Sequence, residues 1–152
     1  MAETSVSKAR IQIAEDEYIL AKGTQTQLRA LGYEVTGHAS SGEQAVALAR
    51  RDRPDLVIMD IVMPGEYDGI EAARRIRVEL DIPVIFLTAY SDDETIQRAK
   101  LTAPDGYLLK PFSERELYIA IEMALQRGKQ DKEPRKGWKK DSIADEFDPN
   151  LL

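Results

Sequence analysis

Four short apolar runs of this chain each end in a side chain that can handle a charged ligand. The residues at these ends are Glu15, Asp16 and Glu17 after 10–14, Asp60 after 55–59, Thr88 after 83–87, and Lys110 after 106–109. Runs this short and this apolar are typical of buried strands, and open α/β sheets bind ligands at the carboxyl ends of their strands. Acids, a hydroxyl and an ammonium at such ends indicate a site for a cation and a phosphoryl group.

The chemistry that fits these side chains is phosphoryl transfer to a carboxylate. A carboxylate can attack a phosphoryl group and form an acyl phosphate, and the reaction depends mostly on positioning and charge stabilisation. Glu15, Asp16 and Asp60 offer the hard oxygens that Mg²⁺ prefers, and without a cation their mutual repulsion raises at least one pKa. Lys110 offers a fixed positive charge, although a lysine that ends a strand is more often simply solvated.

Strand-like and helix-like segments alternate along the chain, which predicts a parallel sheet covered by helices on both faces. Gly32 is a helix stop signal, Ser40-Ser41-Gly42 and Ser91 offer N-caps, and Ser113 with Glu116 forms a capping box. The expected strands are 11–14, 33–36, 55–59, 83–87 and 106–109, and the expected helices are 18–31, 43–51, 69–80, 92–103 and one that begins after Ser113.

Length, charge and composition restrict the class of protein. The chain has 152 residues, enough for one domain and an extension, and contains no cysteine, which fits a reducing cytoplasm. It has no secretory signal and no apolar run near the roughly 18 residues that span a bilayer. Because the formal net charge is −6, we expect no direct nucleic-acid binding.

Taken together, the motifs resemble a response-regulator receiver domain, of the chemotaxis-regulator kind, from two-component signalling. The resemblance covers about residues 9–127, and 128–152 would form a polar, flexible tail. It implies a doubly wound, flavodoxin-like (βα)5 fold with strand order 2-1-3-4-5. The residues that carry it are Glu15-Asp16-Glu17, Asp60 with Met63-Pro64 and Asp68-Gly69, Thr88-Ala89, and Tyr107 with Lys110-Pro111-Phe112.

The resemblance also implies a role for each site residue. Asp60 would be the phosphoacceptor, and Mg²⁺ would be held by Asp60, Asp16, Glu15 (often through water) and the backbone carbonyl of Val62. A cis Lys110–Pro111 bond would place Lys110, and Thr88 would bond a phosphoryl oxygen. Glu17 would cap a helix rather than coordinate. His38, the only histidine, is expected at the surface or at a sheet edge, with no acid to orient it.

As a receiver, the chain would be a switch that assists its own phosphorylation and dephosphorylation, not a turnover enzyme. A histidine kinase or a histidine phosphotransfer protein would supply the phosphoryl group. Thr88 and Tyr107 would then remodel the face made by the fourth helix, fifth strand and fifth helix, for a partner or a homodimer. Tyr107 could also be an ordinary strand aromatic. Val62 and Tyr90 occupy positions that tune dephosphorylation, and we expect slow self-hydrolysis.

Four questions stay open. The loop from Met63-Pro64 to Asp68-Gly69 is one residue longer than the usual family form, so its path is open. An aspartate-nucleophile phosphatase of the haloacid dehalogenase type would need an aspartate at Val62. A stand-alone receiver is preferred to a fragment of a multidomain signalling protein, in which 128–152 would start another domain or fold on a partner. The basic stretch around Trp138 could bind an acidic partner or be a solvated linker.

Overall fold

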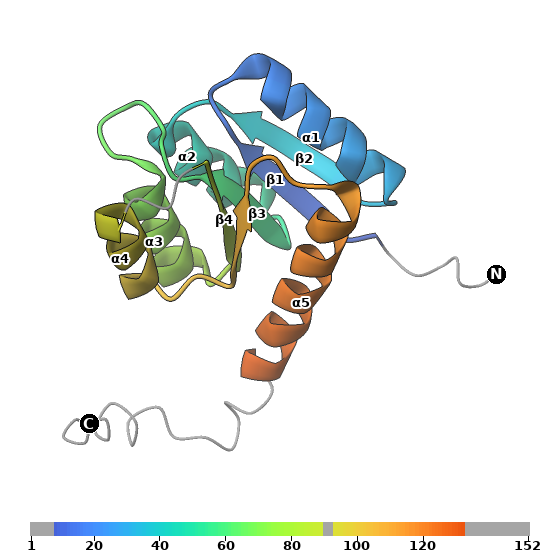
Figure 1. The fold of residues 1–152 in the computed structure, drawn as a ribbon. Helices are drawn as coiled ribbons and strands as arrows, with labels where there is room; N and C mark the ends of the chain where they lie inside the picture. The colour runs from blue at the N-terminus through green and yellow to red at the C-terminus, as the bar shows by residue number, and fades with distance from the viewer. Residues whose placement is uncertain (1–7, 90–92, 133–152) are drawn as a thin grey trace.

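The computed structural model describes the backbone of residues 8–89 and 93–132 and the side chains of that part up to residue 127. Five strands and five helices alternate (Figure 1). The strands are β1 (Arg10–Ala14), β2 (Glu34–Ala39), β3 (Leu56–Asp60), β4 (Val84–Thr88) and β5 (Gly106–Leu109). The helices are α1 (Tyr18–Ala30), α2 (Gly42–Asp52), α3 (Gly69–Leu80), α4 (Asp93–Leu101) and α5 (Glu114–Lys132).

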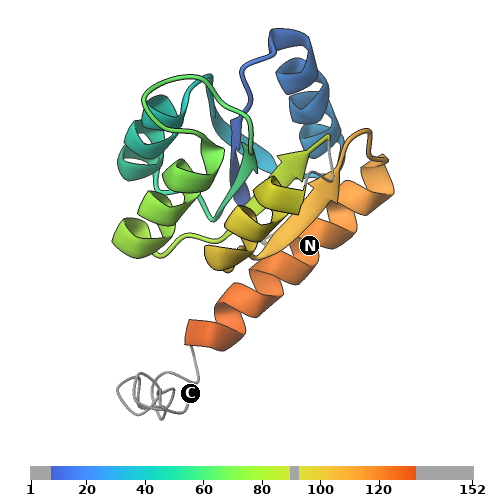
Figure 2. The ribbon, with the colours of Figure 1, turned by 60° about the vertical axis from the view of Figure 1, so that its left-hand side comes forward.

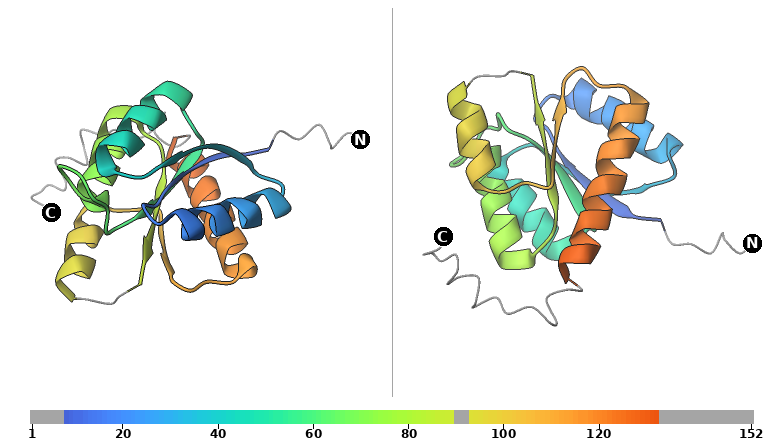
Figure 3. Two further views of the ribbon diagram at one scale, coloured as in Figure 1. Left: turned by 90° about the horizontal axis from the view of Figure 1, so that it is seen from above. Right: turned by 60° about the horizontal axis from the view of Figure 1, so that its bottom comes forward.

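The strands form one parallel sheet in the order β2-β1-β3-β4-β5, so the predicted doubly wound fold is confirmed. Helices α1 and α5 cover one face, and α2, α3 and α4 cover the other (Figure 3). Side chains of β3 alternate between the two cores: Val57 and Met59 pack under α2 and α3, and Leu56 and Ile58 pack under α1 and α5. Burial on both faces explains why the central strands read as continuous apolar runs.

Strand register brings the candidate site residues to one edge of the sheet. Asp60 of β3 pairs with Leu87 of β4, and Thr88 pairs with Leu109 of β5. Since all strands are parallel, the residues that follow β1, β3, β4 and β5 emerge at the same end. The fold therefore gathers side chains that are far apart in the sequence.

Three helices begin with a capping side chain, and those of α2 and α5 lie where the sequence predicts them. Ser41 Oγ accepts a hydrogen bond from the Gln44 N–H at 3.1 Å, which caps α2. The predicted capping box of α5 is present, since the Glu116 N–H donates to Ser113 Oγ at 3.0 Å and the Ser113 N–H donates to Glu116 Oε1 at 2.8 Å. The cap of α3 is Asp68, which accepts from the Glu71 N–H at 3.0 Å.

Some predicted element bounds are wrong. Strand β2 runs from Glu34 to Ala39 rather than over 33–36, because its pairing with β1 continues through polar, half-exposed residues that carry no apolar pattern. Helix α4 ends at Leu101 rather than at Ala103. Helix α5 continues to Lys132, so it takes in the first residues of the segment that we expected to be a tail (Figure 2). Tyr90, Ser91 and residues 133–152 lie outside the described residues. No helix in the described part of the chain is long and apolar enough to cross a membrane.

Candidate functional site

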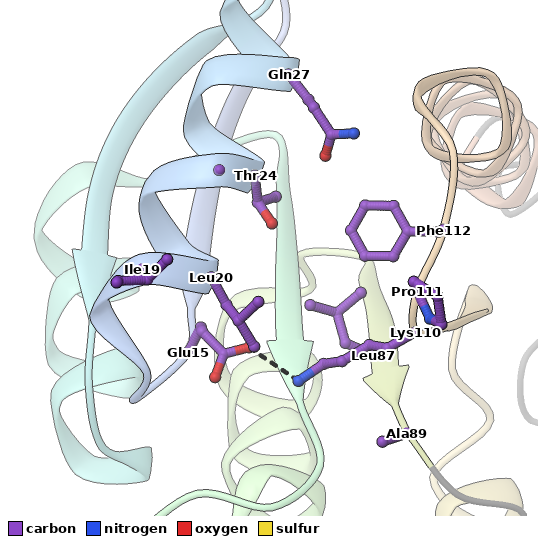
Figure 4. Close-up of a pocket in the computed structure, with 11 residues that line it drawn as sticks. Glu15, Ile19, Leu20, Thr24, Gln27, Leu87, Ala89, Lys110, Pro111 and Phe112 are labelled. Atoms are coloured by element: carbon purple, nitrogen blue, oxygen red, sulfur yellow. Dashed lines mark hydrogen bonds and ion pairs between the residues drawn. The ribbon is translucent and has the colours of Figure 1, made fainter.

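The centre of the site is an ion-pair triad in which one lysine joins two buried carboxylates. Lys110 Nζ lies 2.5 Å from Asp60 Oδ2 and 3.0 Å from Glu15 Oε1. Figure 4 shows the Lys110 side chain reaching across to Glu15. The Asp60 and Glu15 residues are 5% and 2% exposed, so this contact is shielded from water on most sides. The second carboxylate oxygen of Asp60, Oδ1, accepts the Val62 N–H at 2.9 Å.

Backbone hydrogen bonds fix the ends of the strands that carry the triad. The Glu15 N–H donates to the Ala39 carbonyl at 2.9 Å, which extends the β1–β2 ladder by one residue. The Lys110 N–H donates to the Thr88 carbonyl at 2.9 Å, which does the same for β5 and β4. The Lys110–Pro111 bond is cis. Glu15 and Asp60 therefore lie at the ends of the inner strands β1 and β3, and Lys110 follows the edge strand β5.

Burial and mutual contact shift two of the triad's pKa values. The pKa of Glu15 is raised, first by burial and then by its contact with Asp60, although bonds from the Glu17 N–H and Lys110 oppose the rise. Burial lowers the pKa of Lys110, but its bonds to Asp60 and Glu15 outweigh that effect and leave the pKa raised. Lys110 therefore remains cationic at neutral pH.

The acids suit a divalent cation in kind and in charge. Glu15, Asp16 and Asp60 carry three carboxylates against the single Lys110 ammonium, which leaves two negative charges for a cation to balance. In this structure Asp16 is exposed and stays apart from the triad. Among the residues described, no group of three or more His, Asp or Glu side chains is close enough together to hold a metal. The donor set thus fits Mg²⁺ chemically, while the described geometry has Lys110 between two of the carboxylates.

The candidate switch residues lie beside the triad on adjacent strands. Thr88 is 5% exposed at the end of β4. Tyr107 of β5 is 39% exposed, and its ring centroid lies 6.2 Å from that of Phe86, its partner in register. Partial burial raises the pKa of the Tyr107 hydroxyl. Tyr107 is thus a strand aromatic that is partly open to solvent.

The long β3–α3 loop packs against the start of α2, and this contact defines the path of the loop (Figure 1). The Gly42 N–H donates to the Pro64 carbonyl at 3.3 Å, and the Glu66 N–H donates to Glu43 Oε2 at 2.9 Å. Gly65 has φ +114°, and a side chain there would collide with Glu43. Sequence reasoning missed Glu43 and Gly65, because nothing local shows that the two lie together.

The loop ends in a tight approach to Asp60. A Cβ at Gly69 would lie 2.0 Å from the Asp60 carbonyl oxygen, and the Gly69 N–H donates to the Ile61 carbonyl at 3.0 Å. Asp68, one residue earlier, forms an ion pair with Arg98 of α4 at 3.0 Å. The start of α3 therefore contacts both the strand that carries Asp60 and the helix that follows β4.

Two other residues named from the sequence lie near the site without joining the triad. Glu17 is at the N-cap position of α1, but its side chain makes no capping bond, so its expected capping role is wrong. Its N–H instead donates to Glu15 Oε2 at 3.1 Å. His38 lies on the edge strand β2, as expected, with Nε2 2.7 Å from the Glu15 carbonyl oxygen.

A cavity of about 630 Å³ opens next to the triad, between α1 and the β5–α5 loop (Figure 4). Its lining is mainly apolar and includes Ile19, Leu20, Leu87 and Phe112. Glu15 and Lys110 form one end of it. Sequence reasoning did not find this cavity, because its walls come from three separate parts of the chain.

With this geometry established, comparisons with known proteins give the family. Residues 11–122 match the model of the response regulator receiver domain. The chain belongs to this receiver family. The Transcriptional regulatory protein PdtaR of Mycobacterium tuberculosis is 44% identical over 118 residues, and the Probable transcriptional regulator ycf27 of Porphyridium aerugineum is 37% identical over 123 residues. These matches cover 78% and 80% of this chain but 57% and 50% of the relatives, so the receiver spans about half the length of the proteins it matches.

Solved receiver structures share the fold. The signal receiver domain of a modulated diguanylate cyclase from Desulfovibrio desulfuricans superposes with a TM-score of 0.79 at 40% identity, and the match covers 82% of this chain and 99% of that one. A CheY-like receiver from Methanospirillum hungatei gives 0.74 at 25% identity, covering 82% and 99%. The chain is thus a receiver domain of the kind that serves two-component signalling.

Proposed function

We propose that this receiver is a phosphorylation switch in which Asp60 accepts a phosphoryl group from a phosphohistidine. An Asp60 carboxylate oxygen attacks phosphorus, the O–P bond forms as the N–P bond breaks, and the donor imidazole leaves. The observation that carries the proposal is the Lys110 ammonium 2.5 Å from the Asp60 carboxylate. A cation held beside the phosphoacceptor can balance the charge on phosphoryl oxygens.

Mg²⁺ is the proposed cofactor of this transfer. Asp60, Asp16, Glu15 and the Val62 carbonyl would hold it, and the bound ion would neutralise charge on the transferred group. The excess of carboxylates over lysine supports this assignment. The protein's own part is to keep Asp60 fixed through the Val62 N–H and to keep Lys110 protonated at the site.

Thr88 and Tyr107 are proposed to carry the change outward. Thr88 ends β4 next to the phosphoacceptor strand, and Tyr107 lies on the neighbouring strand at the surface. A bond from the Thr88 hydroxyl to a phosphoryl oxygen would draw the threonine inward and let the Tyr107 ring follow. The output face, made by α4, β5 and α5, would then bind a partner or a second copy of the chain.

The proposed donor is a histidine kinase or a histidine phosphotransfer protein. The matched relatives are named transcriptional regulators and are about twice as long as the matched region. An effect on transcription would therefore need a further domain or a partner protein. The haloacid dehalogenase alternative lacks support, because Val62 is where that chemistry needs an acid that can move a proton.

Beryllofluoride, a phosphoryl mimic, tests the switch directly. We expect that beryllofluoride with Mg²⁺ shifts the backbone NMR signals of Thr88, Tyr107 and the residues of α4, and that Asp60→Asn abolishes these shifts. Asp52→Asn, which changes a carboxylate far from the triad, should respond as the wild type does. An unchanged wild-type spectrum, or an Asp60→Asn spectrum that still responds, would contradict the proposal.

A further inference from the structure

We propose that the cavity between α1 and the β5–α5 loop is a binding site for a neutral, mainly aromatic small molecule that carries one hydrogen-bonding group. The volume of about 630 Å³ falls within the range of small-molecule sites, which are apolar pockets with few polar groups. The inference goes beyond the proposed function, because binding here needs no phosphoryl transfer.

The shape and lining favour a flat apolar molecule. Leu20 of α1 and Phe112 of the β5–α5 loop lie on opposite sides of the space, with Leu87 between them (Figure 4). Leu87 is only 1% exposed, so it is reached by a group that enters the cavity rather than by one that rests on the surface. A ring placed between Leu20 and Phe112 would bury both of its faces.

The charges at the cavity favour a neutral ligand. The charged side chains that line it are Glu15 and Lys110, and they form an ion pair with each other at 3.0 Å. An anion would have to draw Lys110 away from Glu15 and Asp60, and a cation would compete with Lys110 for Glu15. Both exchanges would cost buried ion-pair contacts, whereas a neutral molecule leaves the pair intact.

Two polar groups of α1 face the cavity and could orient such a ligand. Figure 4 shows the Thr24 hydroxyl and the Gln27 amide directed toward the open space. Thr24 is 7% exposed. Its hydroxyl could exchange a hydrogen bond with an amide or hydroxyl group of a ligand that enters the cavity.

The cavity is left open by a glycine inside a helix. Gly23 lies near the middle of α1, where glycine costs about 1 kcal/mol relative to alanine. Its backbone does not need glycine, since its φ is not in the left-handed region, and an added Cβ would meet nothing within 4 Å. The missing side chain therefore serves no packing role in the described structure, but it does enlarge the cavity.

The test uses naphthalene-2-carboxamide as the probe and the full chain as the protein. We expect saturable NMR shifts of the methyl groups of Ile19, Leu20 and Leu87, with a dissociation constant of roughly 1 mM for a probe of about 13 non-hydrogen atoms. The matched anion, 2-naphthoate, and the matched cation, 2-naphthylmethylamine, should bind at least about tenfold more weakly.

Gly23→Leu is the decisive variant, because it fills the cavity from a position that tolerates a side chain. It should keep or raise the melting temperature and weaken probe binding at least about tenfold. Thr26→Leu adds the same side chain at an exposed position of α1 outside the lining and should bind as the wild type does.

Three results would overturn the inference. One is the absence of saturable shifts in the wild type at millimolar probe, and another is probe binding that survives in Gly23→Leu. The third is equal binding of the charged and neutral probes. If the probe fails while Gly23→Leu slows phosphotransfer from a phosphohistidine protein and leaves acetyl phosphate reactivity unchanged, the cavity is a protein-docking surface instead.

Discussion

At the scale of single residues, Lys110 decides the character of the site. Its ammonium contacts both Asp60 and Glu15. Because the triad is largely buried, the charge state of each of its residues depends on the other two. The pKa of Glu15 is raised in spite of Lys110. Without Lys110, two carboxylates would face each other in a site largely closed to water.

Replacing Lys110 by methionine should therefore destabilise the protein when Mg²⁺ is absent. The methionine keeps an apolar stem of similar length but leaves Glu15 and Asp60 without a cation. We expect a loss of about 2 kcal/mol in the free energy of unfolding at pH 7, somewhat less than for a fully buried pair. Urea unfolding measures it, with the exposed Lys100→Met as control. Equal stabilities of the two variants would contradict this reading.

Alanine substitutions at Gly69 and Gly23 compare a tightly packed glycine with one that has open space beside it. Gly69→Ala forces a Cβ to within 2.0 Å of the Asp60 carbonyl, so the backbone must move, and we expect a loss of roughly 1–3 kcal/mol. Gly23→Ala places its Cβ in open space and should stabilise by up to about 1 kcal/mol. Denaturant midpoints of both variants measure these changes in stability. A Gly69→Ala protein as stable as the wild type would contradict the close contact between Gly69 and the Asp60 carbonyl.

The residues of the site were predictable where chemistry alone selects them. Asp60, Glu15, Thr88 and Lys110 each follow an apolar strand, and parallel strands bring such ends together. Asp16 is different, because it is exposed and stays apart from the triad, and no sequence pattern fixes the position of its side chain. Residues whose importance comes from a tertiary contact, such as Gly69, have no local sequence pattern that identifies them.

At the scale of elements, burial on two faces made the central strands easy to locate. The bounds of β2 were harder, because an edge strand with half-exposed polar residues lacks both the apolar run and a clean alternation. The end of α5 was also missed, since the polar composition after Arg127 resembles a linker while the helix continues to Lys132. Helix starts were more predictable, because capping depends on a few adjacent residues.

The capping box of α5 should measurably support that helix. Ser113→Ala removes the acceptor for the Glu116 N–H and should lower the free energy of unfolding by about 1 kcal/mol. Ser113→Asn supplies another good capping acceptor and should recover most of that loss. Thermal or urea unfolding of the pair tests the claim, and it fails if the alanine and asparagine variants are equally stable.

At the scale of the whole molecule, a hydrogen bond joins the turn after α1 to α5 within the helical layer that covers one face of the sheet. The Tyr33 hydroxyl donates to Glu122 Oε2 at 2.5 Å, and the Tyr33 ring lies 6.5 Å from that of Tyr118. Burial, followed by the contact with Glu122, raises the pKa of Tyr33 above its ordinary value of about 10. The folded protein therefore keeps the Tyr33 proton at a pH where the unfolded chain releases it.

This contact predicts a dependence of stability on alkaline pH. The stabilisation by Tyr33 is present below pH 10 and is lost as the pH rises, because only the unfolded state gains by ionising. We expect the wild type to exceed Tyr33→Phe by about 1 kcal/mol at pH 8, with the gap closing above pH 10. The exposed Tyr18→Phe serves as control, and a gap that stays constant to pH 11 would rule out the linkage.

The topology of the sheet explains why the candidate site residues lie close together. One parallel sheet, covered on both faces, brings the triad and Thr88 close together, and Tyr107 lies on β5, which is part of the proposed output face. The chain spans about half the length of its matched relatives.

Intact mass after incubation with acetyl phosphate tests directly whether Asp60 is a magnesium-dependent phosphoacceptor. We expect the wild type to gain one phosphoryl group in a reaction that requires Mg²⁺ and is absent from Asp60→Asn, while Asp52→Asn gains it normally. A gain without Mg²⁺, or one that persists in Asp60→Asn, would contradict the assignment of Asp60 as a magnesium-dependent phosphoacceptor.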